Sequence, residues 1–67
     1  MYREGDWVEP ANEAARRVRH PGQILMAQPL PDGQQTLTVQ PPGGRVAWAM
    51  PSDSVRPAEP PARQPAP

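Results

Sequence analysis

The sequence contains no cysteine and no phenylalanine, and its only aromatic side chains are two tryptophans and one tyrosine. Without cysteine, neither a disulfide framework nor a thiolate metal site can support the fold, so cytoplasmic residence is the default prediction. No apolar run approaches the roughly 18 residues that cross a bilayer. Residues 1–8 also lack the basic and then apolar character of a secretory signal. These absences predict a soluble protein with no membrane partner, held together by packing alone.

An excess of charge of one sign is also missing, because seven arginines balance seven carboxylates. Without a bulk cationic field the chain has no global electrostatic reason to accumulate on phosphate backbones, so a dedicated nucleic-acid binder is disfavoured. A chain of 67 residues has room for one domain with a single small core, which excludes a multi-domain enzyme.

Residues that could carry catalysis are few and scattered. There is one histidine, His20, and the carboxylates stand singly along the chain. Catalysis requires a nucleophile with a base, paired carboxylates or a cluster of metal ligands, and no such constellation is visible. We therefore predict a non-enzymatic protein with no cofactor and no metal, and we interpret His20 as a solvated loop residue.

Proline and glycine are abundant, with 12 and 5 residues, and they separate short apolar runs. Short runs between turn signals predict β-strands at residues 5–8, 22–28, 35–40, 45–50 and 54–55. The run 35–40 alternates cleanly, with Leu37 and Val39 on one face. The turn sequences at 31–33 and 41–44 predict two consecutive hairpins. A single 3₁₀ turn fits residues 51–54.

Two segments interrupt this pattern. Residues 9–20 carry alanines at helical spacing, which predicts either a short helix or a long irregular loop with a transient turn, since an alanine stripe buries little. From Pro57 onward the sequence is proline-rich without a large apolar side chain, which predicts a disordered tail over 57–67 with polyproline II character. Such a tail is either passive or itself a ligand for an aromatic groove.

The order of strand, long loop, three-stranded meander, tight turn and short strand predicts an all-β fold: a small SH3-like barrel of about five antiparallel strands over residues 1–56. The predicted core consists of the large apolar side chains on the inward faces: Val8, Ile24, Met26, Leu37, Val39, Val46, Trp48 and Val55.

Several short motifs resemble those of the short, mostly uncharacterised SH3-like barrel proteins of actinobacteria: Gly5-Asp6-Trp7-Val8, Gly22-Gln23-Ile24-Leu25-Met26, the Pro-Pro-Gly-Gly turn within 37–45, the following Trp48, and Val55-Arg56-Pro57. The resemblance covers most of residues 3–58 and implies the barrel fold. It implies no activity, because members of that family share no agreed one. This chain differs by an insertion at 9–20 and by Gln40 where the family pattern has arginine.

The two tryptophans pose a choice about the surface. If Val46 and Trp48 face inward, Trp48 belongs to the core, whereas the opposite orientation would leave Trp48 and Met50 as an exposed apolar stripe. Strand alternation places Trp7 opposite Val8, so with Val8 inside we expect Trp7 to be the exposed aromatic, near Tyr2 and the 9–20 loop.

These features predict a small binding or interaction module whose partner is a protein or peptide. The candidate binding residues are Trp7, Tyr2, Arg16, Arg17 and Arg19. The alternative is a nucleic-acid-associated barrel that uses the Arg16–His20 cluster with Arg45 and an aromatic platform. Against it stand the nearby carboxylates of Glu4, Asp6, Glu9 and Glu13, which balance the cluster along the sequence.

Overall fold

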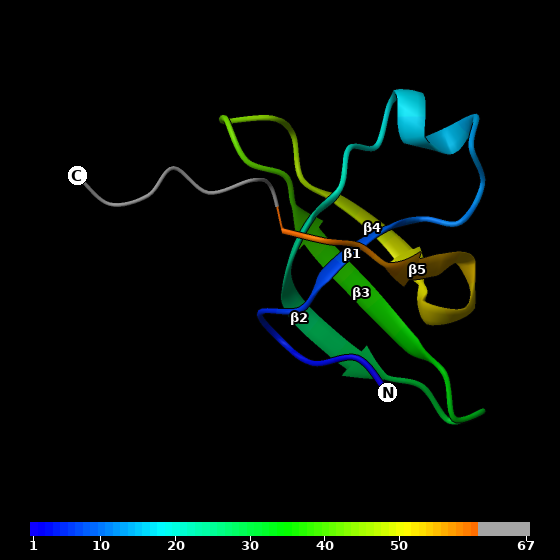
Figure 1. Ribbon diagram of the computed structural model, residues 1–67. Helices are drawn as coiled ribbons and strands as arrows, with labels where there is room; N and C mark the ends of the chain where they lie inside the picture. The colour runs from blue at the N-terminus through cyan, green and yellow to red at the C-terminus, as the bar shows by residue number, and fades with distance from the viewer. Residues whose placement is uncertain (61–67) are drawn as a thin grey trace.

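The computed structural model describes residues 1–60, which form a single sheet of five antiparallel strands (Figure 1). The strands are β1 Trp7–Pro10, β2 Gly22–Pro29, β3 Gln35–Gln40, β4 Trp48–Pro51 and β5 Val55–Pro57. Their order in the sheet is β4-β3-β2-β1-β5. The predicted all-β class, the number of strands and the β2–β3–β4 meander are confirmed.

Two single 3₁₀ turns complete the described chain, η1 Ala15–Arg17 and η2 Ser52–Ser54. The turn η2 lies where the sequence predicts one. The turn η1 is the only regular structure between β1 and β2, so this segment is a loop with one turn rather than a two-turn helix. The Asn12 carboxamide oxygen starts that turn by accepting bonds from the Ala14 and Ala15 main-chain N–H groups, at 2.8 and 3.2 Å.

The core lies on one face of the sheet and contains six of the eight predicted side chains: Val8, Ile24, Leu37, Val39, Trp48 and Val55. Strand β3 contributes two of these side chains because its burial alternates regularly: Leu37 and Val39 both point inward and are 0% exposed. Tyr2, Ala27 and Met50 pack against this cluster while partly buried.

Two predicted core residues, Met26 and Val46, are on the surface instead, 54% and 87% exposed. In β2 the register shifts between Ile24 and Met26, and this irregularity reverses the phase, so that Ala27 packs against the core in place of Met26. Strand β4 begins only at Trp48, so Val46 lies in the preceding loop, where strand alternation does not apply.

The last strand is joined to the first near the end of the described chain. Strand β5 includes Pro57, and the Ala58 main-chain N–H donates a hydrogen bond of 2.9 Å to the Trp7 carbonyl oxygen. The chain beyond Pro60, and with it most of the predicted proline-rich tail, lies outside the described residues.

Candidate functional site

A hollow of about 290 Å³ opens beside β1, and we call it the Trp7 hollow. Its lining comes from four separate parts of the chain: β1, the residues before β2, the β3–β4 loop and the residues after β5. The lining residues are Trp7, His20, Pro21, Pro42, Arg45 and Glu59. One aromatic ring and two proline rings give it an apolar floor, and three titratable side chains give it a polar rim.

His20 is held in place on this rim by two contacts. Its main-chain carbonyl oxygen accepts a hydrogen bond of 2.8 Å from Nε1 of the core residue Trp48. Its ring Nε2 lies 3.2 Å from Nη1 of Arg45, with the guanidinium as the donor because arginine has no acceptor. His20 is thus a loop residue of intermediate exposure whose main chain is tied to the core and whose ring contacts Arg45 at the surface.

The β3–β4 loop, which supplies Pro42 and Arg45, is fixed by Gln40. The Gln40 Nε2 group donates hydrogen bonds to the carbonyl oxygens of Pro41 and Arg45, at 3.0 and 2.7 Å. Gly43 and Gly44, with φ of +79° and +75°, take the left-handed conformations that close this loop. Gln40 thus closes the loop with hydrogen bonds.

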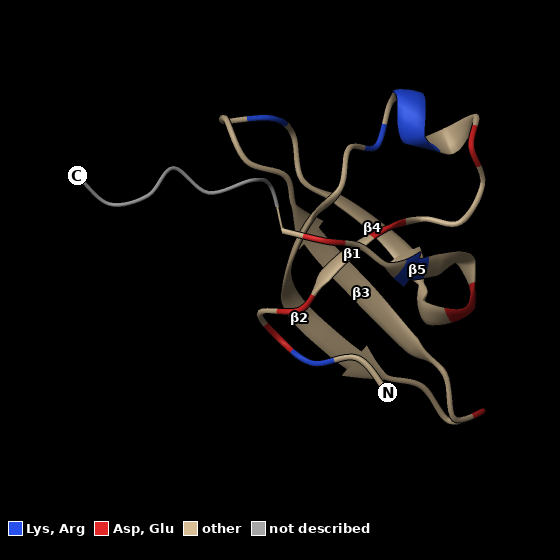
Figure 2. Ribbon diagram, in the orientation of Figure 1, with Lys and Arg blue, Asp and Glu red and all other residues tan. Residues whose placement is uncertain are grey.

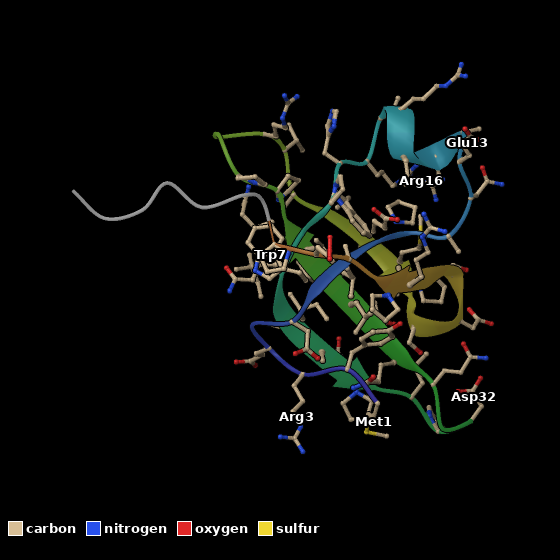
Figure 3. All side chains as sticks on the ribbon, viewed as in Figure 1. Met1, Arg3, Trp7, Glu13, Arg16 and Asp32 are labelled. Atoms are coloured by element: carbon tan, nitrogen blue, oxygen red, sulfur yellow. The ribbon has the colours of Figure 1, made fainter. Side chains whose placement is uncertain are left out.

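Trp7 is half-buried on the outward side of β1, whose burial alternates, while Val8 is fully buried. Trp48 is only 8% exposed, so Trp7 is the tryptophan that is available at the surface. The expected opposition of Trp7 and Val8 and the expected core position of Trp48 are both confirmed. Figure 3 shows the Trp7 ring on the side of the molecule where the described chain ends.

Tyr2 does not share this hollow. It lines a second, more polar hollow of about 320 Å³ together with Met1, Gly33, Gln34, Gln35, Ser52 and Asp53. The buried Gln35 side chain fixes Tyr2 there: Oε1 accepts from the Tyr2 main-chain N–H, and Nε2 donates to the Tyr2 carbonyl oxygen, both at 3.0 Å. Tyr2 and Trp7, grouped as one site from the sequence, are thus in separate places.

The three predicted arginines of the 9–20 loop differ in their surroundings. Arg16 has a structural contact, because its Nη1 donates to the carbonyl oxygens of Pro10 and Ala11, at 2.9 and 3.2 Å. Arg17 and Arg19 are exposed. Through the Arg45–His20 contact, a fourth arginine joins this end of the molecule.

Figure 2 shows how the charges are distributed over the fold. The arginines of η1, of the chain leading to β2 and of the β3–β4 loop lie on one side, whereas Glu4 and Asp6 lie in the N-terminal segment away from them. Glu9 is paired with Arg56 of β5. Glu4 and Asp6 therefore lie away from the arginine cluster, whereas Glu9 is engaged with Arg56 and Glu13 lies within the same loop as Arg16, Arg17 and Arg19.

Of the six lining residues, Trp7 is the one predicted for peptide binding; His20 and Arg45 were named only for the nucleic-acid alternative, and Pro21, Pro42 and Glu59 were not predicted. One general rule bears on them: a core tryptophan needs an acceptor for its indole N–H. Which carbonyl the indole would reach, however, depends on long-range packing.

Within residues 1–60, no group of three or more His, Asp or Glu side chains is placed to hold a metal ion. In this part of the chain, no helix has the length and apolar character needed to cross a membrane.

No protein-family model matches the chain, and neither a curated protein nor a solved structure shows a significant similarity to it.

Proposed function

We propose that this protein is a small non-enzymatic binding module that captures a short segment of another protein in the Trp7 hollow. The observation that carries the proposal is a half-exposed tryptophan beside two prolines, in a hollow whose walls are fixed by hydrogen bonds to the core and to the sheet. Tryptophan is the residue that most often anchors protein interfaces, and a preformed wall lowers the ordering cost of binding.

The dimensions of the hollow favour a peptide over a small-molecule substrate. A volume of about 290 Å³ is at the lower limit of pockets that enclose a drug-sized ligand, about 300–1,000 Å³. It fits one or two side chains of an extended segment that continues over the surface. Aromatic rings beside prolines are typical of grooves that bind polyproline II segments.

The finer fold also belongs to this proposal: we infer that the five strands curl into an SH3-like barrel, and that the chain is related to the actinobacterial proteins it resembles. The support is the strand order, which places the first and last strands side by side with an antiparallel register from Val8↔Pro57 to Pro10↔Val55. Cytoplasmic residence, inferred from the lack of cysteine, is part of the same proposal.

A fluorescence-anisotropy screen with short, dye-labelled, proline-containing peptides tests the function. We expect at least one peptide to bind, and Trp7→Ala to weaken it by about tenfold or more while the thermal midpoint changes little. Leu25→Ala is the matched control, because Leu25 is exposed on β2 and does not line the hollow. Failure of the whole panel to bind, or equal losses in the two variants, would contradict the proposal.

The second candidate function is association with nucleic acid, which the position of Arg45 favours. The structure brings this arginine and the Trp7 ring to the end of the 9–20 loop, so cations and an aromatic platform lie together. A titration with single-stranded DNA and RNA at low salt tests it. Tight, salt-sensitive binding that is lost when Arg17 and Arg19 are replaced by alanine would favour this function over peptide binding.

A further inference from the structure

Arg45 is an arginine of the Trp7 hollow whose orientation is set but whose hydrogen-bonding capacity is mostly unused. Its Nη1 contacts His20 Nε2, and within residues 1–60 the guanidinium makes no other side-chain hydrogen bond and no ion pair. A guanidinium has five N–H donors in a planar fork that matches a carboxylate. The contact with His20 therefore leaves most of the N–H donors of Arg45 available for an acidic group.

The surface around Arg45 carries further positive charge. Arg17 and Arg19 are exposed on the loop that ends at His20, and Arg16 adds its charge from η1. Among residues 1–60, Glu9 is already paired with Arg56, which leaves Glu13 of the same loop and Glu59 of the lining as the carboxylates beside these four arginines, although the whole chain has no formal net charge. An exposed positive surface beside an apolar hollow is complementary to an acidic segment that carries an apolar anchor.

We propose that the ligand of the Trp7 hollow is an acidic, proline-containing peptide segment. In this complex a proline ring packs on Trp7 between Pro21 and Pro42, a carboxylate accepts from the Arg45 fork, and further acidic residues lie toward Arg19. This inference rests on the proposed peptide-binding function and adds the chemistry of the partner to it.

The presence of Glu59 in the lining favours an acidic peptide over a nucleic acid as the negatively charged ligand. A nucleic-acid strand carries a phosphate at every nucleotide and would place charges against Glu59 and Glu13 as well as on the arginines. A peptide spaces its carboxylates by sequence and can leave the position facing Glu59 uncharged. Four arginines with two interspersed carboxylates thus fit a peptide better than a continuous phosphate backbone.

The test uses the full chain and three labelled peptides of equal length, each with a central Pro-Pro pair, flanked by glutamates, by glutamines or by lysines. We expect the glutamate peptide to bind about tenfold tighter than the glutamine peptide, as one charge-assisted hydrogen bond supplies. The preference should shrink as salt is added, and the lysine peptide should bind most weakly.

Variants assign the preference to one residue. R45Q should remove most of the preference for the glutamate peptide over the glutamine peptide, whereas R3Q should leave it unchanged, because Arg3 does not line the Trp7 hollow. A thermal melt of each variant establishes that both remain folded. Both substitutions remove one arginine from an exposed position, so the comparison isolates the location of the charge.

Failure of this inference and failure of the proposed function give different results. Equal binding of the glutamate and glutamine peptides, lost in W7A, would overturn the acidic preference and leave the peptide site standing. Binding of no peptide, or binding that survives W7A, would overturn both. A single-stranded oligonucleotide that binds the chain more tightly than the glutamate peptide would also overturn the inference, in favour of nucleic acid.

Discussion

Replacing Gly22 by alanine tests whether the close approach of β2 to the end of β3 is required for the fold. Gly22 is buried, and a Cβ atom built on it would lie 2.6 Å from the Gln40 carbonyl oxygen and 2.7 Å from the Pro41 nitrogen. These are main-chain atoms, so no side chain can rotate away. An ordinary carbon–oxygen contact is about 3.3 Å, so the two segments must separate by about 0.7 Å.

The expected loss of unfolding free energy in Gly22→Ala is the difference between two opposing effects. Overpacking a rigid core costs about 1–3 kcal/mol, whereas the lower chain entropy of alanine in the unfolded state returns about 0.4–1 kcal/mol. The net destabilisation is about 1–2 kcal/mol, which in a domain of this size lowers the thermal midpoint by about 5–15 °C. That is a large part of the roughly 3–5 kcal/mol that a core this small supplies.

Thermal unfolding followed by circular dichroism measures the effect. Gly44→Asn is the control, because a Cβ there meets nothing within 4 Å and asparagine tolerates the positive φ of that position. We expect this control to melt within a few degrees of the parent. If Gly22→Ala melts within about 2 °C of the parent, the close approach is not rigid and the reasoning is wrong.

Three further substitutions test the core, the clamp on Tyr2 and the 9–20 loop. Leu37→Ala removes a fully buried side chain and should cost about 2–5 kcal/mol, enough to abolish a cooperative melt by circular dichroism. Gln35→Ala removes both bonds to the Tyr2 main chain and should cost about 1–3 kcal/mol in urea unfolding; an unchanged midpoint would mean that water replaces the amide. Arg16→Ala should destabilise by about 1 kcal/mol through loss of its contact with the Pro10 carbonyl, whereas exposed Arg17→Ala should fall within about 0.5 kcal/mol of the parent; equal effects would refute the structural role of Arg16.

The number and order of the strands and most of the core could be predicted from the sequence alone. The alternation in residues 35–40 and the proline–glycine turns on either side act over a few residues, and such local signals need no knowledge of the rest of the chain. Local signals also predicted the turn η2 and the placement of Trp7 and Val8 on opposite faces of β1. Their physical basis is backbone geometry and the two-residue repeat of a strand.

Long-range packing sets where this two-residue repeat is interrupted and which loops come into contact. The register shift in β2 exposes Met26, and the late start of β4 exposes Val46, because strand pairing and not the residue itself sets the phase. The Trp7 hollow brings together residues 7, 20, 21, 42, 45 and 59, whereas the hydrogen bonds with Gln35 hold Tyr2 in a different hollow. Such meetings depend on contacts between residues far apart in the chain, such as the indole of Trp48 on the carbonyl of His20, which no local pattern encodes.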